Sequence, residues 1–533
     1  MHRLPYTLAW SRGDSLGRRA EWIVFRLSLA WLGGLAWMRP LALPDEGRYV
    51  GVAWEMFRSN DWITPTLDGL PFFHKPPLFY WITAAAMHLF GPGEWAARCA
   101  PIASASVTVT ILYVVCREWL GEKTAAIAAL VLATQPLFFG GAQFANMDML
   151  VAACISAAIL FGARAALRFE AGQERRGDLA RAAVALALGV LAKGLIGLLI
   201  PILVLLIWLG LVRHWRTVRA LVWLPGAAIF AVIATPWFAA VQWEHPGFAH
   251  YFFVVQHLQR FAGGGFNNVQ PFWFYVPVLF LFTLPWSGWL LGNLRQSSTA
   301  QSSRPAVLSL MCVWLVVVLG FFSLPQSKPV GYILPALVPL AVLVALTAAP
   351  LVQRSERMRT AWRASLGAAV AVCVAVTVGF TVSHPKSSRS LAQALAAHAH
   401  SAGNVVLLDE YRYDVPFYLR SASPVTVVAN WNAADVQLHD NWRKELADAG
   451  DFAPAAATDR LIDEAAFHSA LCAGRVQWVI ADREVARRFP FLDAAEILAT
   501  ERSASLWRLD AANRSLRAAL ACNVVRTASG LGR

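Results

Sequence analysis

The stretch from Pro44 to Trp81 reads PDEGRYVGVAWEMFRSNDWITPTLDGLPFFHKPPLFYW and follows the first long apolar run of the chain, residues 22–40. It opens with two adjacent acids, Asp45 and Glu46, and it later contains His74 and Lys75 directly before a double proline. Ionisable side chains at a membrane boundary are costly and tend to be functional. The stretch therefore predicts chemistry at the membrane surface rather than a simple anchor or pore.

The composition predicts an integral membrane protein. Of the 533 residues, 57% are hydrophobic and 15% are charged, whereas soluble domains contain roughly 25% charged residues. The 23 Trp and 30 Phe residues fit a lipid-facing surface with aromatic belts. We expect a polytopic α-helical membrane protein with about eleven spans, or about thirteen if two short segments also cross. The apolar runs fall near residues 22–40, 97–116, 123–141, 147–167, 179–193, 194–212, 220–241, 271–293, 305–324, 330–350 and 362–382.

The distribution of charge predicts the topology. Residues 384–533 contain 17 basic and 17 acidic residues, so the formal net charge of +13 lies entirely in residues 1–383. There it falls in short loops between apolar runs, which we expect to be cytoplasmic together with the amino terminus. This pattern argues against nucleic-acid binding. An odd number of spans leaves the carboxy terminus outside, and the short run 76–90 is then interfacial or re-entrant.

The chain divides into two predicted domains. Residues 1–383 form a membrane domain with a periplasmic loop at 41–96, and its first span is an uncleaved one because no A-x-A site follows. In residues 384–533 the short runs NVVLLD, PVTVVAN, VQWVIAD and SLWRLD alternate with Ala-rich stretches, which is typical of a small α/β domain. Cys472 and Cys522 lie in this part, and whether they pair depends on an oxidising compartment.

The candidate catalytic residues are acids expected on the outer face. Asp45 and Glu46 can orient or deprotonate an acceptor, although such acids also flank many spans as solvated groups. Asp148, in QFANMDML, opens an apolar run, where an acid can also simply favour a helix N-terminus. Lys75 is a candidate phosphate ligand, and the alternative is a lysine that snorkels at the interface.

Further candidates are basic and imidazole side chains on the same predicted face. Arg48, Arg260 and Lys328 are candidate substrate or phosphate contacts. His74 and His257 could bind a divalent metal ion such as zinc, against the alternative of ordinary polar histidines. No P-loop and no dinucleotide-binding fingerprint occurs in the sequence. A donor carried on a lipid therefore fits better than a nucleotide-activated one.

Taken together, the chain resembles the bacterial branch of the polytopic GT-C glycosyltransferases. The nearest resemblance is to the aminoarabinose transferases that modify lipid A and to the protein O-mannosyltransferases. It extends over nearly all of residues 40–340, and the tail piece DVPFYLRSASPVTVV resembles the outer domain of the family. The stretches that carry it are PDEGRYVGVAWEM, NDWITPTLDGL, FFHKPPLFYW, GPGEWAARCAP, FANMDML, LAKGLIGL, QHLQRF, QPFWFYVPVLF and SKPVGYILP.

The resemblance implies a bacterial inner-membrane enzyme that transfers a sugar from undecaprenyl phosphate to a periplasmic acceptor, with inversion at the anomeric carbon. It implies that Asp45 is the principal catalytic acid, Lys75 a phosphate ligand and Asp148 a second acid. His257 matches a family histidine implicated in metal binding. One departure stands out: many arabinose transferases have Glu in FEKPPL, where this chain has His74, which changes the charge of the site by one.

Several alternatives stay open at this point. The acceptor is a lipid A phosphate, another glycolipid or a protein hydroxyl, and the sugar is undetermined. A transporter or flippase for a lipid-linked sugar would place its polar groups near the bilayer midplane on broken helices within inverted repeats. Here they are expected at one face, which favours the enzyme. A scaffold whose loop charges only anchor lipid headgroups would tolerate Asp45→Asn.

Overall fold

The protein is described by a computed structural model, which covers residues 15–259, 268–291, 305–383, 386–398, 404–421, 423–434, 436, 441–502, 504–510 and 512–522. Two compact units make up this part of the chain. The membrane unit contains the described residues up to Arg39 together with His74–Ser383. The C-terminal unit contains Pro40–Phe73 together with the described residues after Ser383. The sequence analysis assigned the first loop, 41–96, to the membrane domain, but its first part packs with the chain that follows Ser383.

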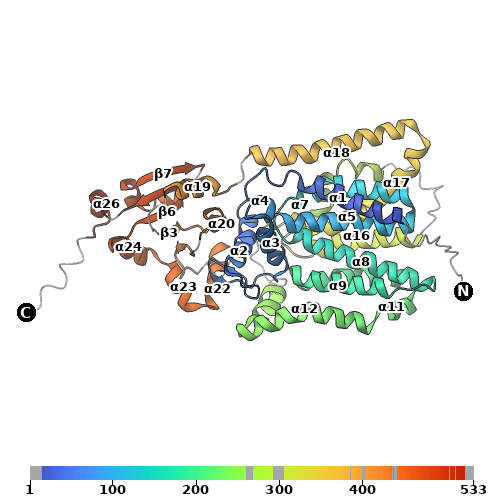
Figure 1. Ribbon diagram of the computed structural model, residues 1–533, viewed down its shortest axis with the longest axis horizontal. Coiled ribbons are helices and arrows are strands. Elements are labelled where there is room, and N and C mark those ends of the chain that lie inside the picture. The colour runs from blue at the N-terminus through green and yellow to red at the C-terminus, as the bar shows by residue number, and fades with distance from the viewer. Residues whose placement is uncertain are drawn as a thin grey trace, which may run out of the picture. The chain divides into compact units, whose positions relative to one another are not determined.

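The membrane unit is built almost entirely of helices. Its central helix α8 packs against α5, α9 and α10. Helices α5, α8 and α9 run in the same direction across the membrane unit in Figure 1. The elements are α1 (Ser15–Gly33), α3 (Leu78–Phe90), α4 (Glu94–Ala97), α5 (Cys99–Leu120), α6 (Glu122–Thr134), α7 (Pro136–Ala142), α8 (Asp148–Glu170), α9 (Arg176–Lys193), α10 (Ile196–Leu211), α11 (Trp215–Leu221), α12 (Leu224–Glu244), the π-helix η1 (His250–Gln259), α14 (Tyr275–Phe282), α15 (Gly288–Leu291), α16 (Pro305–Ser323), the 3-10 helix η3 (Val330–Ala336), α17 (Leu337–Arg354) and α18 (Glu356–Val382).

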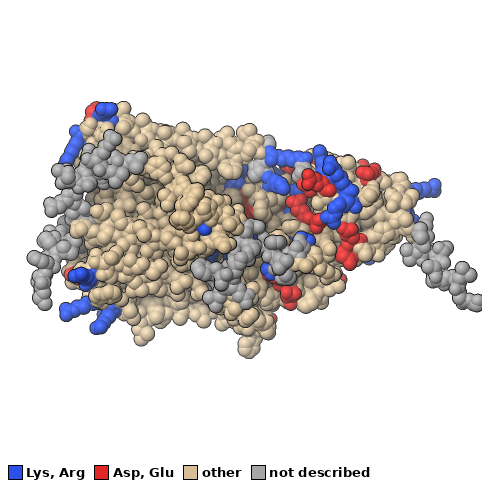
Figure 2. Space-filling model, turned by 180° about the vertical axis from the view of Figure 1, so that it is seen from behind, with Lys and Arg blue, Asp and Glu red and all other residues tan. Residues whose placement is uncertain are grey.

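Six helices among the described residues are long and apolar enough to cross a membrane, and a seventh is reached if the bent pair α6 and α7 forms one span. Helices also form at the predicted runs 179–193 and 194–212, but α9 fails this test and α10 has only 16 residues. The predicted eleven to thirteen spans therefore exceed the helices that meet this criterion. Figure 2 shows the surface of the membrane unit as broadly uncharged, with Lys and Arg gathered at one end, as a lipid-facing surface requires.

The C-terminal unit contains a six-stranded mixed sheet in the order β5-β4-β3-β6-β8-β7. Strands β3 (Asn404–Leu408), β4 (Thr426–Val428), β5 (Leu461–Ile462) and β6 (Gln477–Asp482) are parallel, and β8 (Ala504–Leu509) and β7 (Glu496–Glu501) add antiparallel. The four runs expected to be strands are confirmed as β3, β4, β6 and β8. The helices of this part are α19 (Arg389–His398), α20 (Val415–Leu419), α22 (Trp442–Asp451), α23 (Pro454–Arg460), α24 (Glu464–Cys472), α25 (Arg483–Ala486), η4 (Pro490–Ala494) and α26 (Arg514–Ala519).

Apolar side chains form the core of the C-terminal unit, and a disulfide lies at its edge. Val406, Val479 and Trp507 are buried in one cluster with Phe467 of α24 and Leu516 of α26. Cys472 and Cys522 are joined, with their Cα atoms 5.5 Å apart, so the pairing that the sequence left open is present. The bridge ties the end of α24 to the chain that follows α26.

The first loop adds one helix and one hairpin to the C-terminal unit. Helix α2 (Asp45–Ser59) is followed by the short antiparallel strands β1 (Thr66–Leu67) and β2 (Leu70–Pro71). The turn between them uses Asp68 and Gly69, which both have positive φ angles, 54° and 68°, as a type I′ hairpin requires. This is the DG signal in the sequence, and it fixes the tip of the hairpin.

Candidate active site

The two predicted acids at the start of α2 lie in different environments. Glu46 is fully buried, and its Oε2 accepts the backbone N–H of Ala42 at 2.9 Å, which satisfies a donor just before the helix. The side chain of Asp45 is 55% exposed and is therefore open to a ligand. Both acids occupy the first turn, where the helix dipole favours negative charge. The geometry gives Glu46 a structural task and leaves Asp45 as the accessible carboxylate.

Arg48 lies one turn after Asp45 and links it to α22 within the C-terminal unit. Its Nη2 donates to Asp45 Oδ1 at 2.9 Å, and its Nη1 donates to Glu445 Oε1 of α22. Glu445 Oε2 accepts the hydroxyl hydrogen of Tyr413 at 2.6 Å. Burial opposes the charge of Arg48, but Glu445 and its other neighbours outweigh it, so the pKa of the guanidinium is raised well above its ordinary value. Arg48 is thus a fixed cation, held between two carboxylates.

Two glycines explain how α2 reaches this position. A Cβ atom on Gly47 would lie 3.0 Å from the backbone N of Asp414 and 3.1 Å from Tyr413 Cβ, and one on Gly51 would lie 2.9 Å from the carbonyl oxygen of Tyr413. Gly47 and Gly51 are four residues apart and share one face of the helix. The absence of side chains on that face lets α2 approach the backbone at 413–414 closely, which places Arg48 beside Tyr413.

In the membrane unit, Asp148 forms an ion pair with Lys193. Asp148 is the first residue of α8 and Lys193 the last of α9, and their side chains are only 13% and 9% exposed. The ammonium also lies 4.2 Å from the centre of the Tyr332 ring, a cation–π contact. Gly331 leaves room for the carboxylate, because a Cβ atom there would lie 2.4 Å from Asp148 Oδ2. Asp148 is therefore a held, charge-balanced acid rather than an isolated one.

The structure places the remaining predicted residues as follows. His74 is buried, and its ring centre lies 5.9 Å from that of Tyr251 on η1. Lys75 is half-buried and precedes α3 in the sequence. Lys328 is buried, and its Nζ donates to the carbonyl oxygens of Pro325 and Gln326. The side chain of His257 and the whole of Arg260 lie outside the described residues, so their predicted roles stay predictions.

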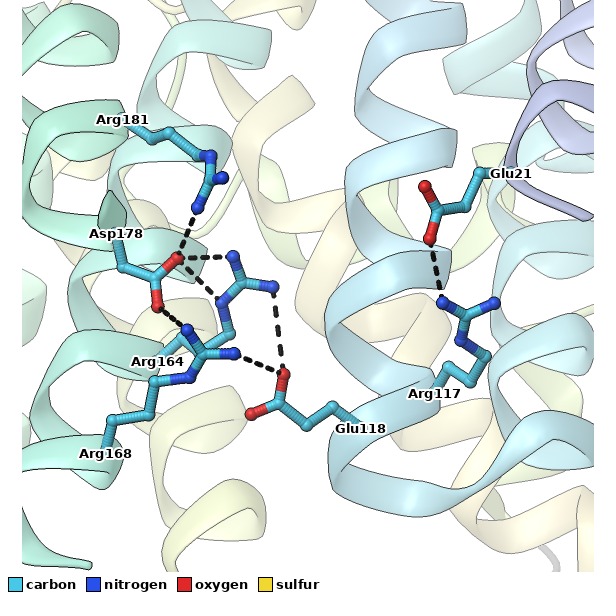
Figure 3. A network of polar contacts seen from close by, with 7 residues as sticks. All are labelled: Glu21, Arg117, Glu118, Arg164, Arg168, Asp178 and Arg181. Carbon is cyan, nitrogen blue, oxygen red and sulfur yellow. Dashed lines mark hydrogen bonds and ion pairs between the residues drawn. The ribbon is translucent and has the colours of Figure 1, made fainter. Parts of the chain in front are cut away.

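A second ionic network lies toward the other end of α8, as Figure 3 shows. Fully buried Asp178 of α9 accepts hydrogen bonds from Arg164 through Nε at 3.0 Å and from Arg181 at 3.0 Å, and it pairs with Arg168 at 2.8 Å. Glu118 of α5 pairs with Arg168 at 3.1 Å. Residues 149–163 between Asp148 and this network carry no charge, so α8 has ionic contacts near each end and an apolar middle.

The described residues include no group of three or more His, Cys, Asp or Glu side chains that could hold a metal ion. The predicted pair of His74 and His257 is not tested by this, because the side chain of His257 is outside that part of the chain. Glu445 and Tyr413 are residues that sequence reasoning missed. Glu445 stands in the polar stretch NWRKELADAG, which has the pattern of an ordinary amphipathic surface helix.

Comparison with known proteins shows that parts of the chain are similar to membrane glycosyltransferases. Residues 74–239 match the family described as dolichyl-phosphate-mannose-protein mannosyltransferase. The undecaprenyl phosphate-alpha-4-amino-4-deoxy-L-arabinose arabinosyl transferase of Aeromonas hydrophila is 33% identical over 321 residues, which are 60% of this chain and 58% of that protein. The chain is similar to these arabinosyl transferases over this stretch. The match spans less than two thirds of the relative's length.

Solved structures show that the arabinosyl transferase fold extends over nearly the whole chain. The crystal structure of ArnT from Cupriavidus metallidurans bound to undecaprenyl phosphate has a TM-score of 0.75 at 24% identity, and the match covers 93% of this chain and 98% of that one. An Archaeoglobus fulgidus oligosaccharyltransferase in complex with Zn and sulfate has a TM-score of 0.53 at 13% identity, covering 86% and 68%. The expected GT-C-like helical membrane fold with a small C-terminal sheet is therefore confirmed.

Proposed function

We propose that this protein is a bacterial inner-membrane glycosyltransferase that moves a sugar from an undecaprenyl-phosphate donor to an acceptor at the periplasmic face. The observation that carries the proposal is the similarity to arabinosyl transferases whose name includes the donor, undecaprenyl phosphate-linked 4-amino-4-deoxy-L-arabinose. The ArnT fold, seen with undecaprenyl phosphate bound in that protein, supports the same donor class. The proposed acceptor is a phosphate of lipid A, and a glycolipid or protein hydroxyl is the alternative.

The proposed reaction is a displacement at the anomeric carbon. An acceptor oxygen supplies the electron pair for the new bond, the bond from the sugar to the undecaprenyl-phosphate oxygen breaks, and undecaprenyl phosphate leaves with the electron pair. A phosphate acceptor is already ionised near neutral pH. Asp45 would then orient the acceptor, whereas for a hydroxyl acceptor it would remove the proton.

Each further residue has a proposed role that matches its surroundings. Lys75 would bind the donor phosphate as a point charge and stabilise the leaving group. Lys328 is already held by two backbone carbonyls, which fixes its charge at one place, so it suits a phosphate as well. Asp148, paired with Lys193, would bind sugar hydroxyl or amino groups. Arg260 is a further proposed phosphate contact.

The proposal of a divalent metal ion rests on the sequence alone, which offers His74 and His257 as ligands. His74 is buried beside Tyr251, and His257 would be its partner. Among the described residues, His74 is not part of a group of three or more His, Cys, Asp or Glu side chains that could hold a metal ion. The steps proposed above therefore use only the side chains of the chain itself.

The proposed location of the C-terminal unit is the periplasm, with the amino terminus in the cytoplasm. Disulfides persist in oxidising compartments and are rare in the cytosol, so the Cys472–Cys522 bridge supports this orientation. The arginines around Asp178 support it too, because the positive-inside rule assigns such clusters to the cytoplasmic side. Asp148, near the opposite end of α8, would then face the periplasm.

The proposal is tested by transfer of sugar from an undecaprenyl-phosphate donor pool to lipid A in proteoliposomes. Wild type is compared with D45N and with D61N, a matched control in the same loop, since the Asp61 carboxylate accepts the local backbone N–H groups of Ile63 and Thr64. Product from wild type and D61N, but not from D45N, is the expected result. Equal product from D45N would remove Asp45 from the mechanism. Absence of product with lipid A, glycan and protein acceptors alike would contradict the transferase itself.

A further inference from the structure

The C-terminal unit supplies a carboxylate that acts on the proposed catalytic acid through an arginine. We propose that Glu445 of α22 is a positioning residue for Asp45, and that it works by holding the Arg48 guanidinium. This inference rests on the proposed function, because it assigns Asp45 to the reaction. It gives helix α22, far from α2 in the sequence, a role in catalysis.

A chain of hydrogen bonds and ion pairs runs from buried Glu445 through Arg48 to exposed Asp45. Tyr413 donates to Glu445 Oε2 at 2.6 Å, and Glu445 Oε1 accepts from Arg48 Nη1. The other end of the guanidinium, Nη2, donates to Asp45 Oδ1 at 2.9 Å. Exposure rises along this line, from 4% for Glu445 to 19% for Arg48 and 55% for Asp45. The guanidinium is planar and rigid, so fixing one end of it also fixes the other.

Asp45 cannot be held in place by Arg48 alone. Ion pairs between neighbouring turns of an exposed helix are weak and are screened by salt. A buried carboxylate with a second hydrogen bond is a far better anchor, since losing its partner would leave an uncompensated buried charge. Glu445 meets both conditions. Arg48 also stacks near the Tyr413 ring, 5.3 Å from its centre, which limits its movement further.

The backbone packing of α2 makes the line specific. Gly47 and Gly51 let the helix approach residues 413–414 closely, so Arg48 emerges beside Tyr413 and within reach of Glu445. The same arrangement also admits a purely structural reading, in which Arg48 and Glu445 only clamp α2 to α22. The two readings differ in one respect: positioning requires a cation next to Asp45, whereas a clamp requires only opposite charges at 48 and 445.

A charge swap separates these readings. The R48E/E445R variant keeps opposite charges between α2 and α22, but it places a second acid one turn from Asp45. If Arg48 and Glu445 only hold α2 against α22, the swap restores their function. If they orient Asp45, the swap does not restore it, because no cation lies beside Asp45. E445Q keeps a hydrogen-bonding side chain beside Tyr413 but loses the anionic anchor. R488M is the matched control, because Arg488 bridges Asp409 and Glu464 elsewhere in the same unit.

The experiment measures sugar transfer in proteoliposomes and, separately, the rate of carbodiimide labelling of Asp45 by mass spectrometry. We expect E445Q to lower kcat about 10²-fold, the scale of a misplaced reacting group, with little change in KM. R48E/E445R should stay equally inactive while its thermal unfolding temperature returns toward that of wild type. R488M should retain wild-type transfer. Recovery of kcat in the swap, or wild-type kcat in E445Q, would overturn the proposal.

The labelling rate keeps this inference separable from the proposed function. If wild type transfers no sugar, the proposed function fails, and labelling alone decides whether Asp45 is held. We expect carbodiimide to label Asp45 slowly in wild type and R488M, and faster in E445Q and R48E/E445R. R48M, which removes the cation beside Asp45, should also be labelled faster. Equal labelling in wild type and E445Q would show that Glu445 does not control Asp45.

Discussion

Asp68, at the tip of the β1–β2 hairpin, is predicted to make the C-terminal unit less stable as pH rises. It is fully buried, and its Oδ1 accepts the backbone N–H of Val425 at 2.8 Å. Burial, and then the nearby charge of Glu55, raises the pKa of Asp68 from 3.8 to about 8. Glu55 faces it from α2 and accepts the N–H groups of Asp68 and Gly69. Arg460 donates to the backbone carbonyl of Asp68.

The size of the effect follows from proton linkage. In the unfolded chain Asp68 loses its proton near pH 4, but in the folded unit it keeps the proton until about pH 8. The folded state therefore binds more protons in this window, and the free energy of unfolding falls as pH rises. Over the three pH units from about 5 to 8, at 1.36 kcal/mol per unit, the loss is about 4 kcal/mol.

The substitution that isolates this effect is D68N, which keeps the shape and stays neutral at every pH. We expect the wild-type unit to lose stability between pH 5 and 8, and D68N to lose about 4 kcal/mol less over the same range. The neighbouring side chains of Glu55, Arg460 and Tyr411 are the same in both proteins, so the difference between the two slopes reports Asp68. Hydrogen exchange of residues 60–73, corrected for the intrinsic rate, measures it, with D61N as the exposed control. Parallel slopes for wild type and D68N, or wild-type stability that rises with pH, would refute the reasoning.

Three further perturbations test the packing of both units. K193M should lower the thermal stability of the membrane unit by about 3 kcal/mol, because it leaves the carboxylate partner on α8 without its cation, and K193R should recover most of that loss. Removing the bridge with C472S/C522S should cost about 4 kcal/mol of C-terminal-unit stability, given a sequence separation of 50 residues, and a reducing agent should affect only the wild type. G47A should destabilise the docking of α2 by about 1–3 kcal/mol by overpacking. G93A, where an added Cβ atom has nothing within 4 Å, should leave the stability unchanged. Equal thermal unfolding temperatures for G47A and G93A would contradict the close approach of α2.

Local sequence patterns predicted the elements whose own residues determine them. The strands β3, β4, β6 and β8 follow from short runs of branched and aromatic residues bounded by polar ones. Strands β5 and β7 escaped prediction for different reasons. Strand β5 has only two residues, Leu461 and Ile462, and β7 is an edge strand, EILATE, whose mixed polarity shows no clear alternation. Such strands are determined by their neighbours in the sheet.

The sequence could not show that residues 40–73 pack with the C-terminal unit, because their contacts there lie some 360 residues away in the chain. Gly47 and Gly51 are visible as a spaced pair, but nothing local indicates that their partner is the backbone at 413–414. The same holds for the candidate site. Asp45, Arg48 and Asp148 stood out in the sequence as charges near apolar runs. Their actual pairing needed the structure.

The ion pairs of this chain differ in what they leave available to a ligand. Asp178 has no exposed surface and is enclosed by the guanidinium groups of α8 and α9, so it can only hold helices together. Asp45 engages an arginine through one oxygen and remains more than half exposed. A buried, fully compensated carboxylate contributes little to recognition, whereas an exposed one with a fixed cation behind it is pre-oriented for a substrate. The buried ion pairs of Asp178 therefore contribute to the packing of the membrane unit, whereas Asp45 is the exposed carboxylate to which we assign the contact with the acceptor.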